Sequence, residues 1–290
     1  MPSPDLVATA YAVLVPVKPP AIGKSRLGDL GDGPRRDLAH AFAADTVSAV
    51  LSCDLVARVL VVTDDHLLAR ALSELGADVI PDGTTDLNGT LAQAAAEMHR
   101  RDPLLRLAAV CADLPALRPD ELASALRASD PGRMSFVADQ ERVGTTAVFA
   151  PTIASFRPAF GSGSRREHLE AGAHEIDGVD VPTLRRDVDD PDDLSEALSL
   201  GVGRRTTQVA EALRLRTPLA GVVRDVLQAT VFTFDESTRA GSVLLDDGAE
   251  LPFASNALTG SGLRLLRPGQ RVRLDTDDGQ VTRLQILTLH

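Results

Sequence analysis

Short apolar runs alternate with longer amphipathic segments along most of the chain. The short runs have the length of buried strands, and the longer segments place apolar residues at helical spacing. The pattern predicts strands at 11–18, 58–65, 77–82 and 106–115, later strands in MSFVADQ and TTAVFAP, helices at 34–52, 66–75, 91–101 and 119–128, and a last helix at TQVAEALRLR. This alternation indicates an α/β fold, with a mostly parallel sheet covered by helices on both faces.

The pattern changes near residue 215. Short alternating runs separated by DDG-type turns follow, as in GSVLLDDGAELPF. Such runs are typical of a small antiparallel β-barrel. We therefore expect one domain over 1–217 and a second over 228–290, with a linker at about 217–227.

Charge and composition narrow the classes of function. The formal net charge of −11 argues against general binding to nucleic-acid backbones, but it permits a small anionic substrate in a local positive site. The sequence has neither a membrane-length apolar run nor a secretory leader pattern, so we expect a cytoplasmic protein without membrane contact. Cys53 and Cys111 lie far apart without metal-type spacing, and we expect reduced core thiols.

Both lysines of the chain lie in one short loop. Of 30 basic residues only Lys18 and Lys24 are lysines, and both fall in VKPPAIGKSRL, directly after the first predicted strand. Together with Arg26 they bring positive charge to backbone amides around Gly23, which suits a triphosphate. The loop matches neither a Walker A loop nor a dinucleotide-binding glycine motif. The alternative is a solvated basic loop.

Two other segments offer carboxylates. Asp113 in ADLPAL ends the fourth predicted strand, at the edge where parallel sheets bind ligands. In RDVDDPDDL, Asp187 and Asp189 point to the same side of an extended chain, so both can reach one metal ion. Oxygen ligands at this density favour Mg²⁺. The alternative is an acidic helix start, and we expect both roles to hold for different aspartates, with 190–193 starting the helix.

A fourth region combines glycines, hydroxyl side chains and arginines. It consists of GTTAVF at 144–149 and FGSGSRREH at 160–168. Amide and hydroxyl donors beside arginines suit an anion, so we interpret the region as a pocket for a second, phosphorylated substrate. A flexible loop is the alternative.

Taken together, these blocks resemble a known enzyme family. VPVKPPAIGKSRL, CADLPAL, GTTAVF with FGSGS and a following histidine, and LRRDVDDPDDL occur in the order found in the guanylyltransferase of deazaflavin coenzyme (F-420) biosynthesis. The resemblance covers roughly 9–205 and implies a Rossmann-like nucleotidyltransferase fold. It implies that GTP and a phosphorylated three-carbon acid, phosphoenolpyruvate or 2-phospho-L-lactate, give a guanylylated acid and pyrophosphate. Positioning and charge neutralisation dominate such a reaction, so we expect His168 to be a supporting residue and not a base.

The resemblance also implies roles for individual residues. Lys18, Lys24 and Arg26 hold the GTP phosphates, and the nucleotide-binding set further includes Pro16, Ser25, Asp82 and Asn88. The acid's phosphate and carboxylate are bound by Thr146, Gly161 and Ser164, and Mg²⁺ by Asp113, Asp187 and Asp189. The sequence before Thr146 reads DQERVGTT, with Thr146 where relatives often carry Asn.

The C-terminal segment resembles a cold-shock domain, a small OB-type barrel. Of the aromatic residues that such domains use to stack bases, Phe232, Phe234 and Phe253 remain, and six arginines against eight acidic residues over 228–290 give −2. Nucleic-acid binding is therefore not expected, and our hypothesis is a structural or regulatory role. Two alternatives stay open: a nucleotidyltransferase of this fold with another acceptor, and an RNA-binding regulator with an inactive transferase domain. A homodimer is a further expectation.

Overall fold

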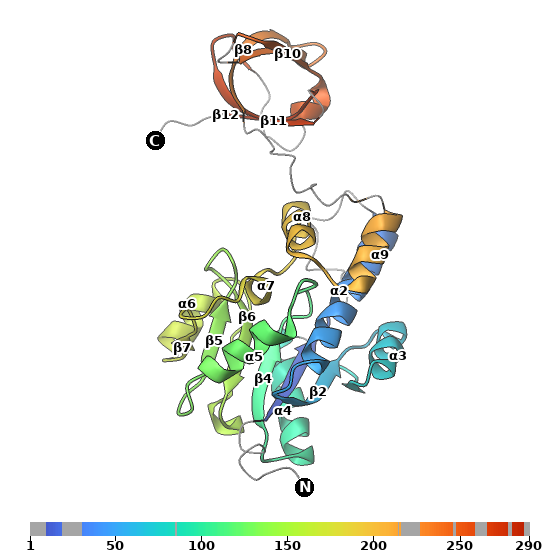
Figure 1. Ribbon diagram of the computed structural model, residues 1–290, viewed down its shortest axis with the longest axis vertical. Coiled ribbons are helices and arrows are strands. Elements are labelled where there is room, and N and C mark those ends of the chain that lie inside the picture. The colour runs from blue at the N-terminus through green and yellow to red at the C-terminus, as the bar shows by residue number, and fades with distance from the viewer. Residues whose placement is uncertain are drawn as a thin grey trace. The chain divides into compact units, whose positions relative to one another are not determined.

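The protein divides into two compact units, Met1–Pro218 and Leu219–His290. The structure, a computed structural model drawn in Figure 1, describes residues 10–18, 31–84, 86–213, 215, 227–245, 248–258, 266–277 and 280–286. Lys24, Ser25 and Arg26 of the predicted phosphate loop lie outside these ranges. No helix in the described ranges is long and apolar enough to cross a membrane.

A seven-stranded sheet forms the centre of the described part of the first unit. Its strands are β1 (Tyr11–Pro16), β2 (Val56–Val62), β3 (Asp78–Ile80), β4 (Arg106–Val110), β5 (Ser135–Ala138), β6 (Thr145–Ala150) and β7 (His174–Glu175). Their order across the sheet is β3-β2-β1-β4-β6-β5-β7. Of these, β6 alone runs against the others, since it pairs antiparallel with both β4 and β5. The predicted mostly parallel sheet is confirmed.

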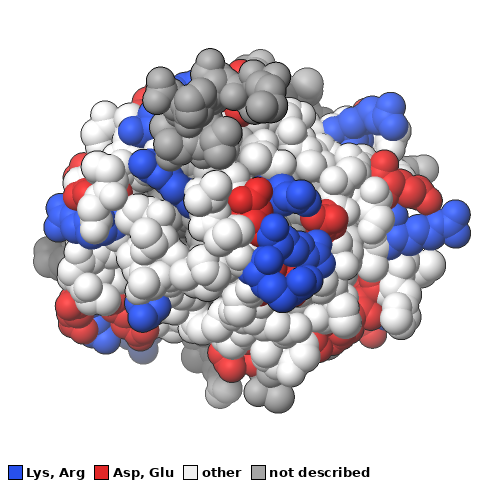
Figure 2. Space-filling view, turned by 90° about the horizontal axis from the view of Figure 1, so that it is seen from below, with Lys and Arg blue, Asp and Glu red and all other residues white. Residues whose placement is uncertain are grey.

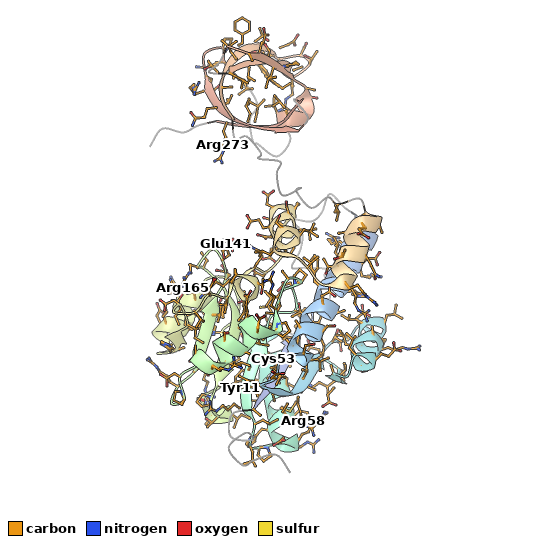
Figure 3. All side chains as sticks on the ribbon, in the orientation of Figure 1. Tyr11, Cys53, Arg58, Glu141, Arg165 and Arg273 are labelled. Carbon is orange, nitrogen blue, oxygen red and sulfur yellow. The ribbon has the colours of Figure 1, made fainter. Side chains whose placement is uncertain are left out.

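Helices cover both faces of this sheet, as predicted. They are α2 (Asp32–Leu51), α3 (His66–Glu74), α4 (Leu87–Arg101), α5 (Pro119–Ala128), α6 (Ser164–Glu170), α7 (Pro182–Arg185), α8 (Pro191–Leu200) and α9 (Arg204–Ala212), with a 3₁₀ turn η2 (Ile153–Ser155). Alternation along β1 sends Tyr11, Val13 and Val15 to the face covered by α2, α3 and α5, and Ala12 and Leu14 to the face covered by α4. Cys53 is buried within this unit (Figure 3), and it forms no disulfide with Cys111.

Several strands end earlier than the apolar pattern predicts. The fourth strand, expected to reach residue 115, stops at Val110. A turn follows in which Leu117 donates its N–H to the carbonyl oxygen of Leu114 (3.0 Å), so Asp113 lies in a loop. The second strand stops at Val62, because Asp65 accepts the N–H groups of Leu67 and Leu68 (3.0 Å each) and begins α3. Polar residues at the strand ends thus belong to connecting loops.

The second unit contains, in its described residues, a five-stranded antiparallel sheet. Its strands are β8 (Leu227–Asp235), β9 (Ala240–Leu245), β10 (Glu250–Phe253), β11 (Arg271–Asp277) and β12 (Gln280–Ile286), in the order β10-β9-β8-β11-β12, with a 3₁₀ turn η3 (Ser255–Leu258). Val231, Val243, Phe253, Val272 and Leu284 are among its buried core residues. Figure 1 shows the strands curving around this core into a ring.

The start of α9 depends on an acidic residue far away in the sequence. Asp45 of α2 is 8% exposed, and its carboxylate accepts the N–H groups of Arg205 (3.1 Å) and Thr206 (2.7 Å). Gly203 lies so close that an added Cβ would collide with the Asp45 carboxyl carbon. The predicted last helix at 207–216 therefore begins earlier, at Arg204.

We expect Asp45→Ala to destabilise the first unit by about 1–3 kcal/mol, because it leaves two N–H groups at the start of α9 without their acceptor. Urea denaturation of the full chain, followed by helical circular dichroism, measures this change. Asp54→Ala, at an exposed position, is the matched control. Equal midpoints for the two variants would show that Asp45 does not hold α9.

Candidate active site

The parallel strands β1, β2, β3 and β4 all end at the same edge of the sheet. Polar residues follow directly: Lys18 after β1, Asp64 after β2, Asp82 after β3 and Asp113 after β4. Ligands of open α/β sheets bind at this edge, because the connecting loops there leave a crevice. The candidate site is built from these loops.

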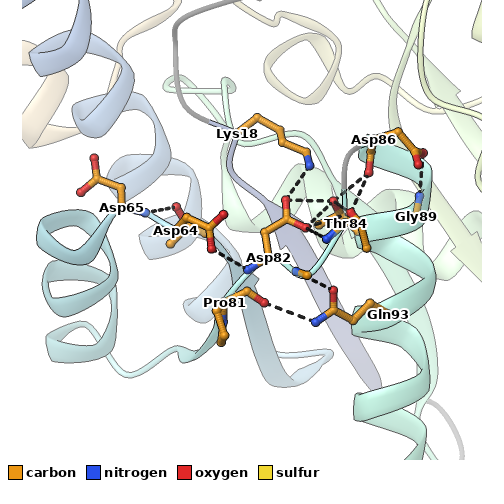
Figure 4. Close-up of polar contacts among 12 residues, drawn as sticks. Lys18, Asp64, Asp65, Pro81, Asp82, Thr84, Asp86, Gly89 and Gln93 are labelled. Carbon is orange, nitrogen blue, oxygen red and sulfur yellow. Dashed lines mark hydrogen bonds and ion pairs between the residues drawn. The ribbon is translucent and has the colours of Figure 1, made fainter.

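Lys18 and Asp82 form its best-defined ion pair, with Lys18 Nζ 2.5 Å from Asp82 Oδ2 (Figure 4). The same carboxylate accepts the N–H (3.0 Å) and hydroxyl (2.9 Å) of Thr84 and the hydroxyl of Thr90 (3.0 Å). Burial alone would raise the pKa of Asp82, but the hydrogen bonds from Lys18, Thr84 and Thr90 hold it below its usual range. Asp82 therefore positions the Lys18 ammonium group, a role that the sequence did not indicate.

Two other predicted nucleotide contacts are placed by the structure. Pro16 is the last residue of β1 and is buried, in register with Val62. Asn88, in the first turn of α4, donates from Nδ2 to the carbonyl oxygen of Phe160 (3.0 Å) and accepts the Phe160 N–H at Oδ1 (2.8 Å). Both polar ends of its amide are engaged by protein backbone. The two partners are 72 residues apart, a separation that no sequence pattern reveals.

The predicted metal ligands Asp113, Asp187 and Asp189 are neighbours. The N–H of Val188 donates to the carbonyl oxygen of Asp113 (3.0 Å), which ties the segment 187–189 to the end of β4. Burial, and then the charges of Asp113 and Asp189, raise the pKa of Asp187 to about 8. Within the described ranges, no three His, Cys, Asp or Glu side chains have a geometry ready to hold a metal ion. The aspartates interact electrostatically without forming a finished metal site.

The next aspartates start α8, as the alternative reading of this acidic run predicts. Asp190 accepts the N–H groups of Asp192 and Asp193 (3.0 Å each), and Asp193 accepts those of Asp189 and Asp190 (3.1 Å each). This reciprocal arrangement is a capping box. The acidic run thus has two separate roles, with Asp187 facing Asp113 and the later residues beginning the helix.

Arg186 is a site residue that the sequence did not reveal. It is 6% exposed, and its guanidinium pairs with Glu141 (3.3 Å), Asp193 (3.0 Å) and Glu196 (2.5 Å). These partners come from the β5–β6 loop and from α8. Arg186 therefore fixes the segment that contains Asp187. Because an arginine in an acidic run looks like an ordinary surface residue, sequence alone gave no signal for it.

The predicted acid-binding residues lie on β6 and on the turn into α6. Thr146 is fully buried, and its Oγ1 has no hydrogen-bond partner among the described residues. The carbonyl oxygen of Thr146 accepts the N–H of Cys111 (2.9 Å), which places Thr146 beside the end of β4. Gly161, at φ +141°, accepts the N–H of buried Ser164 (3.1 Å). A buried hydroxyl without a partner is uncommon in folded proteins and is a candidate ligand contact.

His168 connects the start of β6 to the segment that leads into Gly161. Its Nδ1 lies 3.0 Å from Thr145 Oγ1, and its Nε2 accepts the N–H of Ala159 (3.0 Å). A backbone N–H can only donate, so the proton of the neutral ring is on Nδ1. Burial lowers the pKa of His168 to about 4, so the ring is neutral near pH 7. These contacts agree with the predicted supporting role.

Comparison with known proteins gives one consistent family. The family model "Guanylyl transferase CofC like" matches residues 11–221. The phosphoenolpyruvate guanylyltransferase of Thermomonospora curvata is 47% identical over 215 residues, 74% of this chain and 94% of that protein. The enzyme of the same name from Streptosporangium roseum is 45% identical over 73% of this chain and 95% of its own length. A putative nucleotide-diphospho-sugar transferase from Desulfovibrio desulfuricans shares the fold, with a TM-score of 0.52 at 15% identity over 71% of this chain and 96% of that one.

We expect Asp187→Asn to alter how the stability of the metal-free chain depends on pH. Because the pKa of Asp187 is raised from 3.8 to about 8, the wild-type fold holds a proton that the unfolded chain releases. This bound proton stabilises the folded state fully when the pH is below 3.8, and the stabilisation is lost as the pH rises through about 8. At pH 8 the variant should be more stable than wild type by at least about 1 kcal/mol.

Urea denaturation at several pH values across this window, without divalent metal, measures the difference. Asp54→Asn, at an exposed position, is the control for loss of one negative charge. If wild type and Asp187→Asn lose stability in parallel as pH rises, the fold does not raise the pKa of Asp187.

Proposed function

The chain belongs to the CofC-like guanylyltransferase family, and on that premise we propose that it transfers GMP from GTP to phosphoenolpyruvate with release of pyrophosphate. The choice of phosphoenolpyruvate as the acceptor rests on the sequence identity of 45–47% to enzymes named phosphoenolpyruvate guanylyltransferase, over nearly their whole length. 2-Phospho-L-lactate is the alternative acceptor. The product belongs to the biosynthesis of coenzyme F-420.

The proposed chemistry is an in-line displacement. A phosphate oxygen of the acid attacks the α-phosphorus of GTP, a P–O bond forms, and pyrophosphate leaves as the α–β bond breaks. The nucleophile is already an anion, so no general base is required. Positioning and charge neutralisation are then the main contributions of the protein. The neutral, fully hydrogen-bonded state of His168 supports this view.

Lys18 can bind a phosphate group while its ion pair with Asp82 holds the lysine side chain in place. An ammonium group has three donors, and Asp82 occupies one of them at 2.5 Å. The other donors can bind phosphate oxygens, with Asp82 fixing the direction of the side chain. Lys24, Ser25 and Arg26, also assigned to this phosphate site, stay predictions.

The acid is proposed to bind at Thr146, Gly161 and Ser164. The buried hydroxyl of Thr146, without a partner among the described residues, offers a donor to a phosphate or carboxylate oxygen. Gly161 and Ser164 form the adjacent turn, where backbone N–H groups can approach an anion closely. A hydroxyl–anion hydrogen bond is charge-assisted and therefore stronger than a neutral one.

Asp113, Asp187 and Asp189 fit a hard divalent cation such as Mg²⁺ by their donor chemistry. Carboxylate oxygens are the ligands that Mg²⁺ prefers, and burial, followed by the charges of Asp113 and Asp189, raises the pKa of Asp187. When bound, the cation would neutralise charge that develops on the phosphates. The chain's own contribution is to hold the three carboxylates together through the Val188–Asp113 backbone bond.

For the second unit we propose an OB-type barrel with a structural or regulatory role. Of its aromatic residues, Phe232 is 52% exposed, whereas Phe253 is 4% exposed and stacks on Phe234. A stacking surface for single strands needs several exposed rings, so this pattern does not favour the RNA-binding alternative. Figure 2 draws a face of the first unit, where basic and acidic side chains form small mixed groups and not one basic field. A homodimer stays a prediction.

We expect the purified full chain to release pyrophosphate from GTP when Mg²⁺ and phosphoenolpyruvate are both present, and to do so faster than with 2-phospho-L-lactate. An enzyme-coupled pyrophosphate assay measures both rates, and reactions without acid are the control. Folded protein that releases no pyrophosphate with either acid would contradict the proposed function. A higher rate with 2-phospho-L-lactate would contradict only the choice of acceptor.

We expect Thr146→Val to weaken acid binding, because valine has the same shape but lacks the hydroxyl. The KM for phosphoenolpyruvate should rise about tenfold while the KM for GTP stays within about twofold. Thr207→Val, an exposed position on α9, is the matched control and should change neither constant. An unchanged KM for the acid would mean that the Thr146 hydroxyl faces no substrate.

A further inference from the structure

Helix α4 carries two side-chain amides that each bind the backbone of a different loop. Gln93 donates from Nε2 to the carbonyl oxygen of Pro81 (3.3 Å) and accepts the N–H of Gly83 at Oε1 (3.0 Å). Asn88 binds the N–H and the carbonyl oxygen of Phe160 in the same two-sided way (2.8 and 3.0 Å). Figure 4 shows the Gln93 contacts beside the Lys18–Asp82 pair.

The helix itself is firmly held. Leu91, Ala95 and Met98 are at most 2% exposed and pack on the sheet face formed by Ala12 and Leu14. A step of five residues turns an α-helix by about 140°, so Asn88 and Gln93 project from different sides. One rigid element therefore reaches two loops at once.

The two loops lead to the two halves of the proposed site. Pro81 and Gly83 flank Asp82, which fixes Lys18 on the nucleotide side. Phe160 directly precedes Gly161 on the acid side. His168 holds the preceding residue through the N–H of Ala159 (3.0 Å), and the Phe160 ring packs edge-on against His168. Asn88 thus fixes both backbone groups of the residue that enters the acid-binding turn.

We propose that Asn88 is a positioning residue for the acid subsite, with Gln93 as its counterpart for the nucleotide subsite. This inference rests on the proposed function and replaces the expected contact between Asn88 and the nucleotide. Its basis is that both polar atoms of the Asn88 amide are engaged by Phe160. Without these two hydrogen bonds, the N–H and the carbonyl oxygen of Phe160 would hydrogen-bond to water. The backbone that leads into Gly161 would then no longer be held in one position.

The test compares Asn88→Ala with Gln93→Ala in the full chain, with initial rates measured at varied GTP and varied phosphoenolpyruvate in Mg²⁺. For Asn88→Ala we expect the KM for the acid to rise about tenfold, equivalent to about 1.4 kcal/mol, and the KM for GTP to stay within about twofold. For Gln93→Ala we expect the opposite pattern, with a rise of about threefold in the KM for GTP, because its loop is more exposed to water. A general loss of structure would move both constants in both variants.

A third variant separates the two hydrogen bonds. Asn88→Asp keeps the acceptor for the Phe160 N–H but faces the Phe160 carbonyl oxygen with a second oxygen, so it should not restore the acid KM. Melting curves check that each variant folds. If an Asn88 variant does not fold, Asn88→Ser replaces it. The serine hydroxyl can make one of the two hydrogen bonds to Phe160, so the KM for the acid should lie between those of wild type and Asn88→Ala.

Three results would overturn the proposal. They are an unchanged acid KM in Asn88→Ala, a rise confined to the GTP KM in that variant, and full activity of Asn88→Asp. Absence of turnover in the wild type with either acid would overturn the proposed function and this inference with it. Wild-type turnover with a normal acid KM in Asn88→Ala would overturn this inference alone.

Discussion

One backbone hydrogen bond, from the N–H of Val188 to the carbonyl oxygen of Asp113, determines where the carboxylates of the site meet. It joins a segment outside the sheet to the loop that follows β4, and so places Asp187 within the field of Asp113. Burial removes the water that would screen these charges, and the pKa of Asp187 rises as a result. The Mg²⁺ that we propose to bind here would offset this repulsion between like charges.

The neighbouring residues explain how the fold tolerates that repulsion. Arg186 pairs with acidic side chains of α8 and of the β5–β6 loop, while Asp187 interacts with Asp113. Successive residues of an extended chain project to opposite sides, so a basic and an acidic residue can serve different partners one position apart. The capping box at the start of α8 fixes the other end of the segment. The ion pairs of Arg186 and the capping box thus hold Asp187 close to Asp113 despite their like charge.

Features that depend on short-range pattern were predictable from the sequence. The apolar runs gave the strands of the sheet, and the rule that ligands bind at strand ends pointed to Asp113. The acidic run was expected to have two roles, and the structure separates Asp187 from the capping residues after it. The strands and the helix start were predicted correctly because each rests on neighbours within a few positions, while the ligand roles of Asp113 and Asp187 stay predictions.

Features that depend on long-range contacts were not predictable. Asp45 sets the start of α9 across 160 residues, and Asn88 binds Phe160 across 72. Neither contact can be recognised from the neighbouring sequence. Asp45 is a carboxylate on a helix and Asn88 is an amide in the first turn of a helix, and neither position by itself indicates a distant partner. The sequence assigned Asn88 to the nucleotide, and the contacts of its amide with Phe160 lead to the different role proposed above. The nucleotide contact of Asn88 was inferred from its position beside a motif, whereas the proposed role rests on hydrogen bonds.

The reversed strand β6 shows why the topology matters for the site. In a parallel strand, residues near the active edge come from the carboxyl end, and the amino end lies at the opposite edge. Because β6 runs antiparallel to β4, its beginning lies beside the end of β4: Ala147 pairs with Val110, and the Thr146 carbonyl oxygen accepts the Cys111 N–H. Thr146 therefore reaches the active edge from the start of its strand. A parallel β6 would place Thr146 at the far edge, so this one reversal brings a residue of the proposed acid site to the edge where β4 ends.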